Sequence, residues 1–170
     1  MILGFSGSID SLTGLSQLTK IDGNLIIEAG NDFVDLQGLE NLSEIGGYFY
    51  ANNTNLVNMQ GLESLQKVGS YFFLANNTQL TDMTALSQLD TVMGYLDIVG
   101  NSKLISLQGI QGISFIGDKV RIQDNDRLKD MQDFPALTKI NTELIIYGND
   151  SLLSLNGMEN LETIDGHLNL

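Results

Sequence analysis

Hydrophobic residues return along this chain in a fixed order, which repeats every 24 residues apart from one repeat of 23. Each repeat contains a phrase of the type GLxxL, as in GLENLSEI and GLESLQKV. The phrase begins at Gly14, Gly38, Gly61, Ala85, Gly109, Asp133 and Gly157. The short repeat follows Gly38, so its segment YFYANNTNL (48–56) is the counterpart of YFFLANNTQL (71–80) in the next repeat. A period of this length is typical of a solenoid, in which each repeat forms one coil.

Two apolar columns lie close together within each repeat and indicate a short β-strand. The first column contains Leu25, Phe49, Phe72, Leu96, Val120, Leu144 and Leu168, and the second contains the residues two positions further on, from Ile27 to Leu170. Residues two apart face the same side of a strand, so both columns point into the core. A third column, from Ile21 to Ile164, joins the same core. No stretch keeps a helical period long enough for an ordinary helix.

The columns predict a single repeat domain over residues 1–170, mostly β, in the form of a parallel β-helix or leucine-rich-repeat-like solenoid. Six full coils of about 24 residues cover 14–156, and partial coils cover 1–13 and 157–170. Both partial coils place apolar residues at an open edge of the stack. We therefore expect the chain to be a fragment of a longer protein, or to associate end to end when isolated.

A column of asparagines follows the predicted strand. It contains Asn53, Asn77, Asn101, Asn125 and Asn149. A buried amide at this point can bond both the backbone of the turn and the amide of the next coil, so we expect a structural ladder. The alternative is N-glycosylation, because Asn41, Asn52, Asn76 and Asn149 each begin an Asn-x-Ser/Thr sequon.

The repeat resembles the receptor L domain, the leucine-rich ligand-binding module of insulin-receptor and EGF-receptor ectodomains. Stretches such as NLSEIGGYFY, LDTVMGYLDIVGN and LTKINTELIIYGN carry the likeness, which covers essentially the whole chain. The resemblance implies a right-handed β-helix and a role in recognition outside the cell. Animal receptor members contain cysteines and this chain has none, which favours a microbial cell-surface relative.

All five tyrosines fall between the inward columns, at positions that face outward from the predicted sheet. With one phenylalanine they form the candidate ligand-binding face: Tyr48, Tyr50, Tyr71, Phe73, Tyr95 and Tyr147. Tyrosine is a common interface anchor, so the face suits a protein partner or a sugar ring. The same rings would also stabilise the sheet by pairing from strand to strand, and the sequence leaves both interpretations open.

The other half of the outward face carries charged residues. Lys119 and Glu143 occupy one row at adjacent coils, and Asp97 and Arg121 occupy the next, so we expect two ion pairs across neighbouring strands. A glycan-processing enzyme would need two carboxylates around the scissile bond. Here each carboxylate has a cation one coil away that would hold it ionised, so no catalytic residue is assigned.

Composition removes further classes of function. The net charge of −13 opposes binding to nucleic acid or to anionic lipid, and no apolar run is long enough to span a membrane. The chain has no cysteine and a single histidine, which excludes thiolate and zinc sites. The segment Asp124-Asn125-Asp126 and the Gly-Asn-Asp turns at 30–32 and 148–150 could offer oxygens to calcium, but turn chemistry explains them as well, so no metal site and no cofactor is predicted. The opening residues MILGF lack a basic segment and a long apolar run, so they are not expected to act as a signal peptide.

These observations favour a non-enzymatic recognition or adhesion module, extracellular or at a cell surface, that binds through the outward face of its sheet. A glycan-processing β-helix enzyme and a structural spacer in a surface protein are the alternatives. The identity of the ligand does not follow from the sequence.

Overall fold

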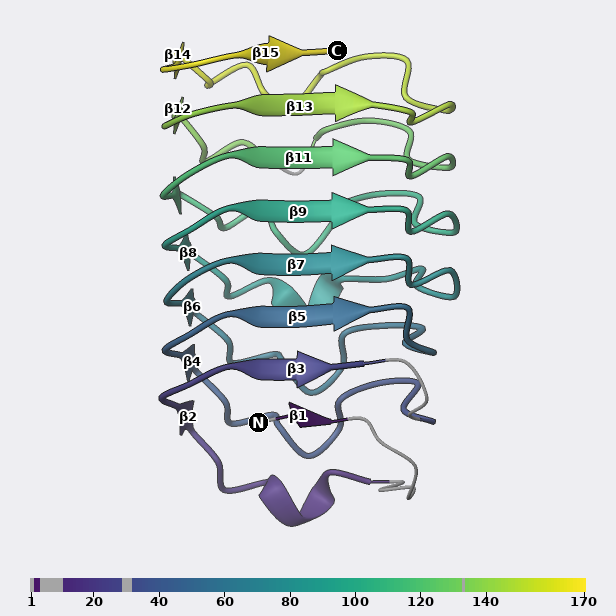
Figure 1. The fold of residues 1–170 in the computed structure, drawn as a ribbon, viewed down its shortest axis with the longest axis vertical. Helices are drawn as coiled ribbons and strands as arrows, with labels where there is room; N and C mark the ends of the chain where they lie inside the picture. The colour runs from purple at the N-terminus through teal and green to yellow at the C-terminus, as the bar shows by residue number, and fades with distance from the viewer. Residues whose placement is uncertain (1, 4–10, 29–31, 133) are drawn as a thin grey trace.

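The computed structural model describes residues 2–3, 11–28, 32–132 and 134–170. Its regular structure consists almost entirely of short parallel strands, wound into a right-handed solenoid whose coils stack along one axis (Figure 1). The predicted fold class is therefore confirmed. Met1 and residues 4–10 of the first partial coil lie outside the described residues.

The main sheet has eight strands in the order β1-β3-β5-β7-β9-β11-β13-β15. They are β1 (Ile2–Leu3), β3 (Leu25–Ile27), β5 (Phe49–Asn52), β7 (Phe72–Ala75), β9 (Leu96–Val99), β11 (Val120–Gln123), β13 (Leu144–Tyr147) and β15 (Leu168–Asn169). Leu25 pairs with Phe49 and Phe49 pairs with Phe72, so the register steps by one repeat at each strand. The apolar columns predicted this register.

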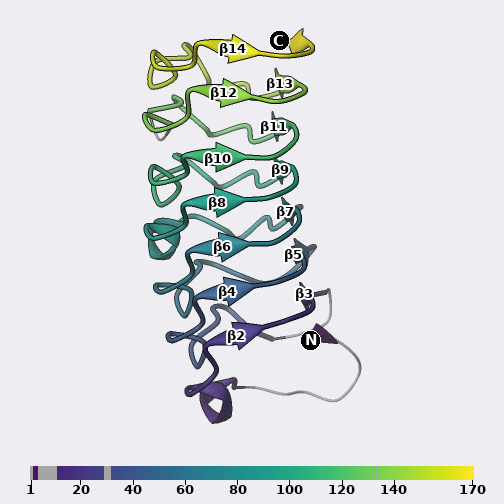
Figure 2. The same ribbon diagram turned by 90° about the vertical axis from the view of Figure 1, so that its left-hand side faces the viewer.

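A second set of strands lies on the adjoining side of the solenoid (Figure 2). They are β2 (Lys20–Ile21), β4 (Glu44–Ile45), β6 (Lys67–Val68), β8 (Thr91–Val92), β10 (Phe115–Ile116), β12 (Lys139–Ile140) and β14 (Thr163–Ile164). The prediction of one strand per coil was wrong, because a bend divides each coil's extended segment in two. At this corner the coils come close together: a Cβ at Gly69 would lie 2.1 Å from the carbonyl oxygen of Gly46.

The inward columns form one continuous core. Leu25, Phe49, Phe72, Leu96 and Val120 are all fully buried. The rings of Phe49 and Phe72 stack with their centroids 4.5 Å apart. Each coil therefore buries its apolar side chains against the coils on either side, and burial of this kind is the main stabilising contribution.

The GLxxL phrase forms a tight turn on the third side of the coil. Gly61 has a φ of +99°, and a Cβ there would lie 1.9 Å from the carbonyl oxygen of Leu36 in the preceding coil. Only glycine fits such a position. The N–H of Gly61 donates to the carboxylate of Glu63 at 2.9 Å, so this backbone group of the turn has a hydrogen-bond acceptor. The described 3₁₀ helices are η1 (Thr13–Leu15) and η2 (Thr84–Leu86), and η2 forms where Ala85 replaces the glycine.

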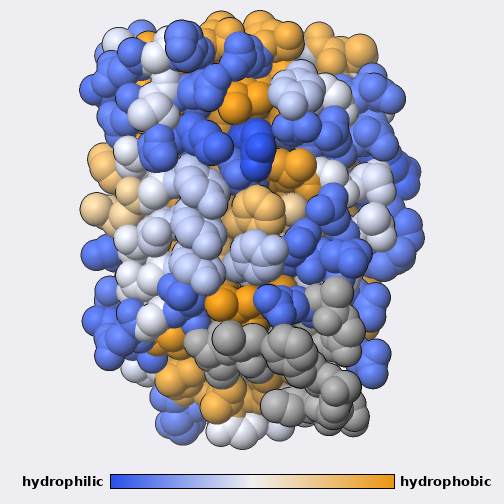
Figure 3. Space-filling model, in the orientation of Figure 1, coloured by the Kyte–Doolittle hydropathy of each residue, from blue (hydrophilic) through white to orange (hydrophobic). Residues whose placement is uncertain are grey.

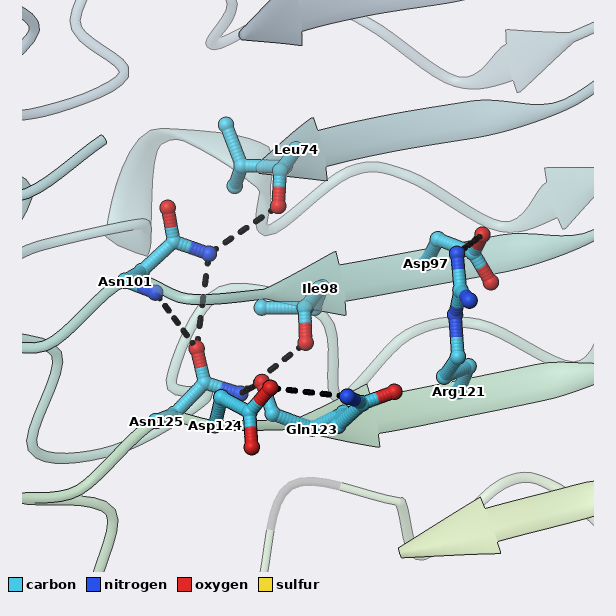
Figure 4. A network of polar contacts seen from close by, with 8 residues as sticks. All are labelled: Leu74, Asp97, Ile98, Asn101, Arg121, Gln123, Asp124 and Asn125. Atoms are coloured by element: carbon cyan, nitrogen blue, oxygen red, sulfur yellow. Dashed lines mark hydrogen bonds and ion pairs between the residues drawn. The ribbon is translucent and has the colours of Figure 1, made fainter. Parts of the chain in front are cut away.

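Buried asparagines form a hydrogen-bonded ladder where the main strands end. The backbone N–H of Asn77 donates to Oδ1 of Asn101, that of Asn101 to Asn125, and that of Asn125 to Asn149, each at 3.0 Å. The side-chain amide of Asn101 also donates to the carbonyl of Leu74 at 2.9 Å (Figure 4). The predicted ladder is confirmed for these four residues.

The assignment of Asn53 to this ladder was wrong. Thr54 occupies that place, and its N–H donates to Oδ1 of Asn77 at 3.0 Å. Asn53 is exposed and has a φ of 54°. Because Asn52 pairs with Ala75, the missing residue of the short repeat lies after Thr54, and Asn53 aligns with Asn76 instead of Asn77.

Candidate binding face

The side chains that alternate with the buried columns form the outer face of the main sheet, seen from the front in Figure 3. Five of the six aromatic residues predicted from the sequence lie on three neighbouring coils in the middle of this sheet, at β5, β7 and the start of β9. Each is half-buried. The alternation of the strand fixes their outward direction.

Three tyrosines form a continuous stack along one row of this face, which we call the tyrosine column. The ring centroids of Tyr48 and Tyr71 are 4.3 Å apart with 9° between the planes. Those of Tyr71 and Tyr95 are 4.6 Å apart with 1° between the planes. Lys119 places its ammonium 5.1 Å from the centre of the Tyr95 ring, on the next strand. The cation covers the last ring of the column.

A second, shorter stack lies in the adjacent row. The rings of Tyr50 and Phe73 lie 5.0 Å apart and 7° from parallel. The Tyr50 hydroxyl accepts a hydrogen bond from the Asn52 side chain at 3.1 Å. On the other side of Phe73 the row continues with Asp97, its register partner on β9.

The stacking decides what the face offers to a ligand. Tyr71 has a ring against each of its two faces, and Tyr95 has Tyr71 on one face and Lys119 on the other. Side chains stand roughly perpendicular to a sheet, so the ring edges and hydroxyls point toward solvent. A sugar that stacks on an aromatic ring needs a free ring face, and both faces of Tyr71 and of Tyr95 are covered by their neighbours in the column.

Asp97 lies in an outward row of this face, as the sequence predicted, but its burial was not predicted. Its side chain is 2% exposed and its Oδ2 lies 2.5 Å from Nη2 of Arg121, whose side chain is 29% exposed. The predicted ion pair is therefore confirmed (Figure 4). Asp97 Oδ1 and Arg121 Nε are buried without a hydrogen-bond partner. Buried polar atoms are nearly always paired, so these two are an exception at the edge of the aromatic stacks.

The second predicted ion pair, between Lys119 and Glu143, was wrong. Lys119 turns toward the Tyr95 ring, and Glu143 accepts a hydrogen bond from the side chain of Asn169. The ring of Tyr95 offers the cation a face that is otherwise open, and Asn169 offers the carboxylate a donor on its other side.

Tyr147 does not join the other candidate residues. It lies at the end of β13, where its register partner is Gln123, and 49% of it is exposed. No described aromatic ring stacks on it. The structure therefore brings five of the six candidate residues together and leaves Tyr147 apart.

The environment of Tyr71 and Tyr95 resists ionisation. Burial raises the pKa of Tyr71 to about 12, and a hydrogen bond with the Tyr48 hydroxyl adds to the rise. Burial, followed by the nearby charge of Asp97, also raises the pKa of Tyr95. Tyr71 and Tyr95 are thus neutral phenols at physiological pH.

Carboxylates line more than one cleft of the described part of the chain. A cleft of about 460 Å³ between two coils is lined by Ser106, Gln108, Gln111, Asp130 and Gln132. A smaller cleft, of about 150 Å³, has Asp32 and Asp35 in its lining. No cluster of three or more His, Asp or Glu side chains among the described residues is placed to hold a metal ion. Among the same residues, no helix has the length and apolar character needed to cross a membrane.

Comparison with known protein families identifies the type of repeat. The profile described as BspA type Leucine rich repeat region matches in six copies, over residues 4–104 and 29–143. No curated protein and no solved structure gave a significant match. The match supports the leucine-rich-repeat kinship expected from the sequence, but not the receptor L domain in particular. Over most of its length, therefore, the chain belongs to the BspA-type leucine-rich repeat family.

Proposed function

We propose that the chain is a non-enzymatic recognition or adhesion module that binds a protein ligand at a cell surface through the outer face of its main sheet. The observation that carries the proposal is the pair of aromatic stacks on three neighbouring coils. Half-buried tyrosines combine a large apolar area with a polar edge, which is the composition of interface anchors.

The distribution of charge supports this face as the contact surface. The whole chain has a net charge of −13. The outward rows of the main sheet contain two cations, Lys119 and Arg121, and three anions, Glu28, Asp97 and Glu143, so their net charge is −1. Charged residues are depleted at the centre of protein interfaces, and the outward residues of β5 and β7, Tyr50, Asn52 and Phe73, carry no charge. The acidic surroundings would steer a basic partner toward it.

The orientation of the rings favours a protein over a glycan. Because both faces of Tyr71 and of Tyr95 are covered, a ligand meets the edges and hydroxyls of these two rings. Edge-on contact suits the apolar side chains and backbone groups of a protein surface. At these two rings a sugar would be limited to hydrogen bonds with the hydroxyls.

The ion pair beside the stacks supplies a polar anchor. Asp97 Oδ1 has no donor, and its carboxylate lies between Phe73 and Arg121 in the row. A partner that inserts an N–H or O–H group after a small shift of Arg121 would satisfy it. Buried hydrogen bonds to a charged group are among the strongest contacts at an interface.

The proposed location rests on family kinship. BspA-type leucine-rich repeats are common in surface and adhesion proteins, and the likeness to receptor L domains points in the same direction. A structural spacer is the remaining non-enzymatic candidate, and it requires no ligand at all.

A binding screen with a matched pair of variants tests the proposal. The probes are an array of purified oligosaccharides and a library of cell-surface protein ectodomains. Both are exposed to the wild-type chain, to a triple variant with Tyr48, Tyr71 and Tyr95 changed to Ser, and to Tyr147→Ser as control. We expect a protein ligand that the triple variant loses and the control keeps. Circular dichroism confirms that each variant is folded.

The other outcomes each exclude a part of the proposal. If an oligosaccharide binds and its binding depends on the tyrosines in the same way, the proposed binding face stands but the ligand is a glycan instead of a protein. Ligand binding that the triple variant retains would remove the face. A chain that binds no member of either set would favour the spacer.

End-to-end association of the isolated chain is a second, independent proposal. Leu168 is 52% exposed and Leu170 is 69% exposed at the strand that closes the main sheet. Exposed apolar side chains beside an unpaired strand edge favour pairing with another copy of the chain. Sedimentation velocity at several protein concentrations tests it, and a monomer at every concentration and salt level would contradict it.

A further inference from the structure

The tyrosine column joins three consecutive coils through contacts between phenol rings. Tyr48, Tyr71 and Tyr95 each lie one residue before a main strand, β5, β7 and β9 respectively. Their rings are in contact at 4.3 Å and 4.6 Å between centroids. The rings of Tyr48 and Tyr71 lie 9° from parallel on neighbouring coils, so their hydroxyl ends lie on the same outward side of the sheet. The ring carbons next to each hydroxyl therefore lie side by side across the coils.

We propose that the tyrosine column is a site of oxidative cross-linking, in which Tyr71 joins to Tyr48 or Tyr95 as dityrosine. The co-reactant is a one-electron oxidant of phenols, of the class that a haem peroxidase generates from hydrogen peroxide. The product is a covalent bond between adjacent coils of a chain that has no cysteine and so no disulfide. This inference is independent of the ligand proposed for the same face.

The chemistry balances within this scheme. The oxidant removes one electron from each of two phenols, and each phenol releases its hydroxyl proton to solvent. The two tyrosyl radicals couple through one carbon–carbon bond between ring positions adjacent to the hydroxyls. The hydrogens on those two carbons then move to the phenolic oxygens, which restores both aromatic rings. Overall two tyrosines lose two hydrogen atoms, and one hydrogen peroxide becomes two waters.

The composition of the chain directs oxidation to this column. Cysteine and tryptophan, the other side chains that readily lose one electron, are both absent, and three of the five tyrosines stack here. Tyr50 stacks on a phenylalanine, which offers no phenol to couple with. Tyr147 has no stacked ring among the described aromatics. A radical formed on Tyr71 is therefore in contact with a second phenol, whereas one formed on Tyr147 is not.

Coupling within one molecule is favoured over coupling between molecules. Groups held together in one chain have effective concentrations of the order of mM, far above a protein present at micromolar concentration. The net charge of −13 also keeps separate molecules apart at low salt. The rings must turn from face-to-face to edge-to-edge for the bond to form, and the half-buried position of all three tyrosines leaves room on the solvent side.

Peroxidase treatment of the whole chain tests the inference directly. The chain is incubated at low concentration and low salt with a haem peroxidase and hydrogen peroxide, then analysed by dityrosine fluorescence and by mass spectrometry of peptides. We expect a monomeric product lighter by two hydrogen atoms, in which the peptide with Tyr71 is joined to the peptide with Tyr48 or Tyr95. Tyr71→Phe keeps the shape of the stack but removes the central phenol. It should lower the intramolecular yield by about tenfold or more, given the effective concentrations above.

Tyr147→Phe is the matched control and should leave the yield unchanged. Three results would overturn the inference: an undiminished yield in Tyr71→Phe, cross-links spread evenly over all five tyrosines, or products that are only intermolecular. The ligand screen does not bear on any of them, so failure here and failure of the proposed function are distinguishable.

Discussion

Arg121 reaches across the main sheet to Asp97 and places Nη2 2.5 Å from Oδ2, while Oδ1 of the same carboxylate has no hydrogen-bond partner. The carboxylate is almost wholly buried and the guanidinium is partly exposed. A single charge-assisted contact therefore holds a buried negative charge on the outer face. Its neighbour in the same row is Phe73, part of the aromatic stacks.

Removal of the cation should destabilise the chain strongly. In Arg121→Leu the buried carboxylate of Asp97 loses its counter-charge, and we expect a loss of about 3 kcal/mol in the free energy of unfolding. The double variant with Asp97→Val and Arg121→Leu should recover most of it, because an apolar pair leaves no buried charge. Urea denaturation measures both. Equal destabilisation of the single and double variants would show that the pair acts only through packing.

Alkaline pH should weaken the fold through the tyrosine column. The folded chain holds the Tyr71 proton up to a pKa of about 12, whereas the unfolded chain loses it near 10. Folded molecules therefore bind more protons between these values, so stability is fully present below pH 10 and falls toward pH 12. Urea midpoints and tyrosinate absorbance across this range measure it. A profile as steep in Tyr71→Phe as in the wild type would contradict the assignment.

Substitution of Asn101 in the asparagine ladder should destabilise the chain, whereas substitution of Asn53 should not. Asn101→Ala removes the acceptor for the Asn77 N–H and the donor to the Leu74 carbonyl in a fully buried site. We expect a loss of about 2–4 kcal/mol, because at least two buried backbone groups lose their partners. Asn53→Gly is the control, since that residue is exposed with a φ of 54° and glycine adopts this conformation freely. Chemical denaturation measures the free energy of unfolding of both variants. Similar losses in the two would indicate that Asn53 belongs to the ladder after all.

The GLxxL turns should tolerate no side chain where the glycine has a positive φ and lies against the preceding coil. Gly109 has a φ of +121°, and a Cβ there would lie 1.9 Å from the carbonyl oxygen of Met83. Gly109→Ala should therefore destabilise the chain by about 2–4 kcal/mol, from strain in the backbone and displacement of a neighbouring coil. Gly14→Ala meets nothing within 4 Å and should be close to neutral. Thermal melts of the two variants would contradict this picture if they coincided.

The sequence predicted the parallel register well because side chains of the same type must lie above one another in a solenoid. The column from Leu25 to Leu168 could only be buried if adjacent repeats paired directly, and the structure pairs them so. The outward direction of the tyrosines followed from the alternation of a strand. Their mutual stacking was one of two interpretations, and the ring geometry establishes it.

Other features could not be predicted because they depend on distances between coils. The bend between paired strands arises where backbone approaches backbone, as at Gly69 and Gly46. Burial of Asp97 depends on how Arg121 and Phe73 lie over it, which a residue pattern does not specify. The deletion in the short repeat could be placed within a few residues only, so Asn53 was assigned where Thr54 stands.

The most direct test of the outer face compares two affinities of the ligand that the screen identifies. One is its affinity for the wild-type chain, and the other is its affinity for the triple tyrosine variant. Titration calorimetry should show a loss of about 100-fold or more in the variant with Tyr48, Tyr71 and Tyr95 changed to Ser, since central tyrosine anchors each contribute about 2 kcal/mol. Asp97→Asn should weaken binding as well, and Tyr147→Ser should leave it unchanged. A folded triple variant that binds with wild-type affinity would contradict the account, because the ligand would then contact another surface.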